Sequence, residues 1–128
     1  MKKKAGLIYL EDDFIQGIHC KFYLDPTTAG GHFSFPVAGD PSAICIIGGN
    51  DDPWWRIVAV LLHECHEFSM TASGNRYRAT GSLGFGSSST KFFFGHDDLE
   101  ETHFYAAGAM ATVLPALQKE WMKLRKKR

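Results

Sequence analysis

The first half of the chain carries the hydrophobic pattern of short β-strands. Apolar and polar side chains alternate over residues 17–24, and shorter apolar runs occur at residues 7–10 and 43–47. Alternation is typical of a strand with one buried face, whereas a continuous apolar run suits a strand buried on both faces or covered by a helix. The acidic residues 11–13 predict a turn between the first two strands. The Gly- and Pro-rich residues 25–42 predict a loop with one short extended piece.

A helical pattern follows and occupies the middle of the chain. Asp52 and Pro53 are typical of a helix N-terminus, and Gly74 is typical of the position just after a C-terminus. The predicted helix has a wide apolar surface made of Trp54, Ile57, Val58, Leu61, Leu62, Cys65 and Phe68. A second side, at the same helical spacing, carries Arg56, His63, Glu67 and Met70.

A hairpin and a last helix complete the predicted elements. Residues 77–94 predict a β-hairpin, and a helix is expected to begin at Asp97 or Asp98. Because Pro115 removes a helical hydrogen bond, we expect a kink or break near Leu114. The predicted apolar face of this helix comprises Leu99, Phe104, Ala107, Met110, Ala111, Leu114, Leu117, Trp121 and Leu124.

These elements predict an α+β fold in one domain spanning residues 1–128. We expect a small antiparallel or mixed sheet that packs on the central helix and on the C-terminal amphipathic helix. A chain of 128 residues is long enough for one hydrophobic core and short for two.

Charge is segregated along the chain although the formal net charge is zero. Nine of the fourteen Lys and Arg residues lie in residues 1–4 and 119–128, whereas the stretch between them holds five basic and thirteen acidic side chains. We expect the basic ends, residues 1–5 and 124–128, to be frayed and solvated. Because the body is acidic, nucleic-acid binding is disfavoured.

Cysteine usage and hydropathy indicate the compartment. Cys20, Cys45 and Cys65 are odd in number and sit in apolar stretches, so no disulfide framework is indicated. The N-terminal residues contain neither a signal-peptide apolar region nor an 18-residue membrane span. We therefore expect a cytoplasmic protein that does not enter a membrane.

The candidate chemistry lies on the central helix. His63 and Glu67 are four residues apart, so on a helix they project from one face about one turn, or about 5.4 Å, apart, close enough to share a cation. Ionisable groups on a Val- and Leu-rich helix are costly to bury without partners. A metal ion is one such partner. The alternative is that the two side chains bond each other or neighbouring backbone at the edge of the core.

The residues around His63 and Glu67 favour the metal site over the simple polar pair. VLLHECHE resembles the active helix of the zincin metallopeptidases, whose H-E-x-x-H motif follows an apolar run. The resemblance implies that His63 is a zinc ligand and Glu64 the general base that activates a water. Glu67 stands where the second His of the motif would be. A carboxylate is an acceptable zinc ligand, but it lowers the positive charge that the water feels, so the motif argues for metal more strongly than for catalysis.

A third ligand must come from elsewhere in the chain. In zincins that use a later helix it follows the motif by some tens of residues, and His96 meets that order, with His103 and then Glu100 as alternates. His66 is a further alternate, although helical geometry turns it about 100° away from Glu67. The order of strands, H-E-x-x-E helix, hairpin and terminal helix also looks like small zincin-like proteins carried by phages and prophages. The site of synthesis would then be the bacterial cytoplasm.

Three functions remain open at this point. The first is a zinc-dependent peptidase or amide hydrolase acting on a peptide partner through an edge strand at residues 43–47. The second is a non-catalytic phage-type structural or inhibitor protein that binds another protein and keeps a structural or degenerate zinc site. The third is a di-iron site built from Glu64, Glu67 and the E-x-x-H motif of Glu100 and His103. It is disfavoured because such bundles draw ligands from four helices.

Overall fold

The computed structural model is an α+β protein with one mixed sheet and two long helices. It describes residues 6–36, 41–50, 52–72, 76–78, 90–92 and 96–127. The elements are β1 (Ile8–Ile15), β2 (Ile18–Asp25), β3 (Gly31–Ser34), β4 (Ala43–Gly48), α1 (Trp54–Ala72), β5 (Arg76–Arg78), β6 (Thr90–Phe92) and α2 (His96–Lys126). The predicted fold class is confirmed.

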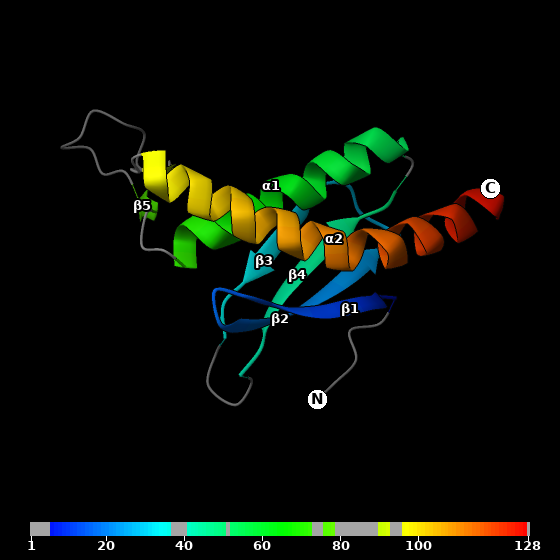
Figure 1. Ribbon diagram of the computed structural model, residues 1–128. Helices are drawn as coiled ribbons and strands as arrows, with labels where there is room; N and C mark the ends of the chain where they lie inside the picture. Colours follow the sequence, from blue (N-terminus) through cyan, green and yellow to red (C-terminus); the bar gives the residue numbers. More distant parts are fainter. Residues whose placement is uncertain are drawn as a thin grey trace.

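The four-stranded sheet has the order β1-β2-β4-β3, in which β2 and β4 are parallel and the two outer pairs are antiparallel. Both helices cover the same face of this sheet, with α1 over β3 and β4 and α2 over β1 and β2 (Figure 1). Strands β5 and β6 form a separate antiparallel pair between the helices in sequence, as the predicted hairpin requires. The predicted loop between these strands lies outside the described residues.

The core lies between the sheet and the helices. Alternate residues of β2 and β4 are opposite one another and point to the helices, and all are at most 2% exposed: Cys20, Phe22, Leu24, Ala43, Cys45 and Ile47. Ile57, Leu61, Cys65 and Phe68 of α1 close over them. Because these side chains recur at helical spacing, burying them fixes the rotation of α1 about its axis.

One local prediction about the first strands is corrected and one is confirmed. Residues 11–13 do not form a turn: β1 continues through them to Ile15 with a bulge between Tyr9 and Glu11. The turn lies at Gln16 and Gly17, both with positive φ. The acidic side chains fit a strand because they are only partly buried. The short extended piece predicted in the loop is β3.

The edge at β1 and β2 is fastened by a chain of hydrogen bonds that the sequence did not reveal. His19 bonds Asp12 through Nε2 and Ser42 through Nδ1, each at 2.8 Å, and the Tyr9 hydroxyl donates to the other oxygen of Asp12. Burial raises the pKa of Asp12, but the hydrogen bonds from Tyr9 and His19 and the charge of His19 outweigh it and lower that pKa. Three segments, β1, β2 and the residue before β4, are joined here.

Helix α2 agrees only in part with its prediction. It runs as one helix through Pro115, so of the predicted kink or break the break is absent. Its buried residues are Thr102, Ala106, Ala109, Val113 and Leu117, whereas Phe104, Ala107 and Ala111 are exposed, Phe104 to 75%. Five residues of the predicted face do contact the core: Leu117 is buried, and Met110, Leu114, Trp121 and Leu124 pack against the core partly buried. Trp121, on the predicted face, packs against Trp54 as expected for a core residue.

The close packing of backbone around Gly48, at the end of β4, can be tested by substitution. A Cβ atom at this position would lie 2.5 Å from the Thr28 carbonyl oxygen and 2.7 Å from the Ala29 carbonyl carbon, which are backbone atoms. We predict that Gly48→Ala lowers the free energy of unfolding by about 1–3 kcal/mol, measured by urea titration.

The control for this change is Gly108→Ala. No atom lies within 4 Å of a Cβ built at Gly108, which is inside α2. Alanine is the better helix former, so this variant is expected to gain about 0.5–1 kcal/mol. Equal effects of the two substitutions would contradict the close approach at Gly48.

Candidate metal centre

Helix α1 presents the H-E-x-x-E residues in three different environments. Glu64 is 5% exposed, whereas the side chains of His63 and Glu67 are 70% and 23% exposed. The difference follows from the 100° step of the helix: with Cys65 and Phe68 packed on the sheet, Glu64 turns toward β3 and its neighbours reach the margin. The motif therefore lies where buried and solvent-exposed surfaces of α1 meet.

His63 and Glu67 contact each other directly. The distance from His63 Nε2 to Glu67 Oε2 is 3.0 Å. One donor atom from each of His63, Glu64 and Glu67 lies within 4.8 Å of the other two, and this is the group of three or more such side chains found among the described residues. Two ligands of a tetrahedral zinc ion are about 3.3–3.6 Å apart, given bonds of about 2.0–2.2 Å. The observed 3.0 Å is the distance of a direct ion pair, so the two donor atoms would have to separate slightly to hold one ion between them.

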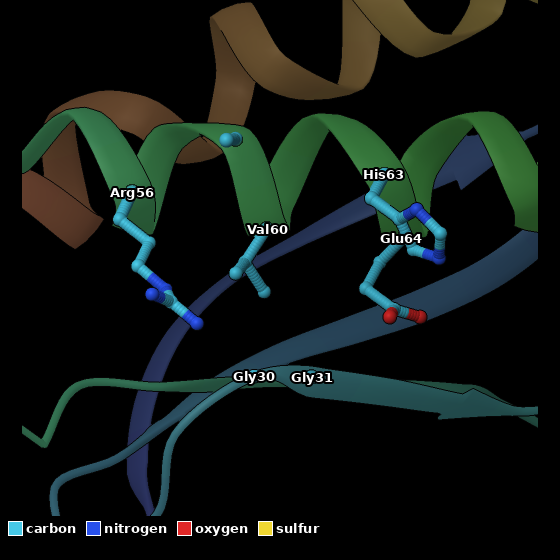
Figure 2. A pocket seen from close by; sticks show the side chains of 7 residues that line it. Gly30, Gly31, Arg56, Val60, His63 and Glu64 are labelled. Atoms are coloured by element: carbon cyan, nitrogen blue, oxygen red, sulfur yellow. The ribbon is translucent and has the colours of Figure 1, made fainter. Parts of the chain in front are cut away.

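Glu64 extends beneath α1 into a pocket of about 400 Å³. Figure 2 shows its carboxylate directed toward the strand that begins at Gly31, on the same side of the helix as Arg56 and Val60. Burial raises the pKa of Glu64, and the neighbouring charge of Glu67 raises it further, while His63 acts in the opposite direction. A carboxylate with a raised pKa is a stronger base than an ordinary carboxylate, which suits it to proton transfer.

Gly31 forms the floor of this pocket because it has no side chain. A Cβ atom there would lie 2.8 Å from Val60 Cγ1 and 3.1 Å from Glu64 Cγ. Sequence reasoning missed this residue: it treated Gly31 as part of a loop, and nothing local indicates which helix will cross a glycine. The close approach of β3 to α1 is what gives Glu64 a buried yet reachable position.

The predicted third ligands are not brought to this group by the described residues. His96 begins α2, but its side chain lies outside the described residues, so the first-choice ligand stays a prediction. Glu100 is exposed on α2. His103 contacts His66 instead, with 4.7 Å between ring centroids. Burial, together with His103 and His63, lowers the pKa of His66.

The three buried cysteines have no part in this chemistry. Burial raises the pKa of Cys20 and of Cys65 to about 12, and that of Cys45 also rises well above its ordinary value. All three are free thiols in the core. As the sequence predicted, no disulfide framework is present among the described residues.

Comparison with known proteins gives no assignment. No protein-family model, no curated protein and no solved structure matches this chain. Within the described residues, neither helix has an apolar stretch long enough to cross a membrane.

The buried carboxyl group predicts a pH-dependent stability. Because the pKa of Glu64 is raised above the ordinary 4.5, proton binding favours the folded state. This contribution is present below pH 4.5 and is lost as pH rises through the folded pKa. We predict that Glu64→Gln becomes more stable relative to the unmodified protein between pH 4 and pH 7, measured by urea unfolding of metal-free protein.

The exposed Glu101→Gln change on α2 controls for loss of a surface charge. A stability difference between Glu64→Gln and the unmodified protein that falls with rising pH would contradict the buried, proton-binding state of Glu64.

Proposed function

We propose that this chain is a zincin-like domain in which His63 and Glu67 hold one zinc ion and Glu64 acts as the general base of peptide or amide hydrolysis. The observation that carries the proposal is the grouping of these three side chains, two of which, His63 and Glu64, line the pocket beneath α1. The order of the residues is that of the zincin motif, with Glu67 in place of its second histidine. The three side chains that lie close together in space are therefore the same three that the motif names.

The donor set suits zinc better than the harder cations. Imidazole nitrogen with carboxylate oxygen is a common zinc pair, whereas magnesium and calcium prefer oxygen ligands alone. Zinc, when bound, supplies Lewis acidity toward a carbonyl oxygen and lowers the pKa of a water. The remaining ligand is proposed to be His96. Its first alternate, His103, contacts His66 instead, which leaves Glu100 as the alternate. The i, i+4 spacing lets α1 itself supply the other two.

Glu64 is suited to the proton-transfer role. Its carboxylate faces the pocket, which His63 also lines, and one donor atom from each of His63, Glu64 and Glu67 lies within 4.8 Å of the other two. The raised pKa brings its affinity for a proton closer to neutral pH. It can take a proton from an attacking water and return it to a leaving amine.

Strand β3 supports a peptide as the substrate or partner. The sequence placed the edge strand at residues 43–47, but β4 is an inner strand between β2 and β3, and β3 is at the sheet edge. Gly31 at the start of β3 also lines the pocket that holds Glu64. An extended peptide that pairs with β3 would therefore pass the candidate base.

The second candidate is a non-catalytic protein that binds another protein. The observation that favours it is the direct contact between His63 and Glu67, which gives each side chain a partner without a metal. Exposed pairs of this kind contribute little to stability. If the protein is non-catalytic, replacing the Glu64 carboxylate would leave its biological effect intact.

Removal of His63 tests the metal. We predict that His63→Ala lowers zinc binding by one equivalent per chain in equilibrium dialysis against chelator-treated buffer. His32→Ala is the matched control, because His32 is an exposed histidine of β3 outside the group. Unchanged zinc binding by His63→Ala would remove the site.

Glu64→Gln separates the two candidate functions. The amide keeps the size of the side chain but cannot accept the proton, so hydrolysis should fall by about 10²–10⁴-fold while zinc binding is retained. Cleavage is followed by mass spectrometry on a mixed peptide library. A zinc-loaded protein that cleaves none of these peptides, or a variant that cleaves them as fast as the unmodified protein, would contradict catalysis by Glu64.

A further inference from the structure

A pair of histidines joins the two helices at a place that the proposed function does not use. His66 is on α1 and His103 is on α2, and their ring centroids are 4.7 Å apart with an angle of 44° between ring planes. His66 is half-buried, whereas His103 is exposed. Two side chains 37 positions apart in sequence are thus brought into contact by the packing of α1 on α2.

The distance between the ring centroids is compatible with a shared ion, and it also lies within the range of ordinary packing between two rings. A metal bound to an imidazole nitrogen at about 2.0–2.1 Å lies about 3.2 Å from the centroid of that ring. Two imidazoles on one ion then have centroids about 4.5 Å apart at a right angle and about 5.2 Å apart at the tetrahedral angle. The observed 4.7 Å falls between these values.

Other histidines of the described chain have different settings. His19 uses both ring nitrogens in hydrogen bonds, to Asp12 and Ser42, and His63 contacts Glu67. For His66 and His103, the contact within the described residues is with each other's ring. Both therefore keep ring nitrogens for a ligand.

We propose that His66 and His103 form a second cation site, distinct from the group at His63, that takes a late first-row transition metal ion and links α1 to α2. Two imidazoles select zinc, nickel or copper over magnesium and calcium, which prefer oxygen. Water would complete the coordination, because the group of three close His, Cys, Asp or Glu side chains found among the described residues is the one at His63, Glu64 and Glu67. The site stands whether or not His63 and Glu67 hold zinc.

Binding at this pair has a structural consequence that an isolated surface histidine would lack. An ion held by both rings favours the folded arrangement, because the two ligands come together only when the helices are packed. Zinc should therefore raise the midpoint of thermal unfolding of the chain, and substitution of either histidine should reduce that increase.

The test is zinc binding by the full chain after removal of metal with a chelator. Equilibrium dialysis with zinc alone should give two equivalents for the unmodified protein, one for His103→Ala, one for His63→Ala and none for the double variant. Because the His103 side chain is exposed, the single variant is expected to fold, and circular dichroism verifies this. His66→Ala should reproduce the result of His103→Ala, while His32→Ala should bind two equivalents.

The outcomes separate the second site from the first. If His103→Ala and His66→Ala bind as much zinc as the unmodified protein, the second site is wrong. If His63→Ala loses all binding, the two histidines belong to the first site and the proposal of a separate one fails. If His63→Ala loses none while His103→Ala loses one equivalent, the inter-helix site stands and the proposed function does not.

Discussion

The packing of α1 on the sheet is the constraint from which the candidate site follows. Ile57, Leu61, Cys65 and Phe68 are each at most 1% exposed, and together they fix which side of the helix meets β2 and β4. Once that side is buried, the helical step of 100° per residue determines the direction in which the other side chains of α1 project. Glu64 must turn toward β3, His63 and Glu67 must lie at the margin, and His66 must turn toward α2. The positions of the ionisable side chains around α1 therefore follow from the spacing of its apolar residues.

Burying Glu64 has a cost, and the surrounding structure keeps it moderate. A carboxylate in an apolar setting is unfavourable without partners, and its raised pKa records that cost. The pocket under α1 and the missing side chain of Gly31 leave space beside it. A residue that is destabilising for the fold yet reachable from a pocket is typical of a functional position. The contact between His63 and Glu67 alone would not require any of this arrangement.

The sequence predicts elements with local signals well, but it predicts contacts between distant elements poorly. The start of α1, the buried face of β2 and the strand at residues 43–47 follow from spacing and from Pro53, so they could be read directly. The buried face of α2 could be predicted only in part, because the buried Thr102 and Ala106 are small or polar residues that carry little hydrophobic signal in the sequence. The edge position of β3, the role of Gly31 and the pairing of His66 with His103 all depend on tertiary packing, and no local signal encodes them.

The central claim is that α1 holds a metal ion through His63 and Glu67, and native metal content tests it most directly. Protein purified without chelators from cells grown in zinc-supplemented medium should contain at least one equivalent of zinc per chain by elemental analysis, and His63→Ala prepared in parallel should contain one equivalent less. Metal-free native protein, or equal zinc in both preparations, would contradict the account. The group on α1 would then be an ion pair at the edge of a hydrophobic core.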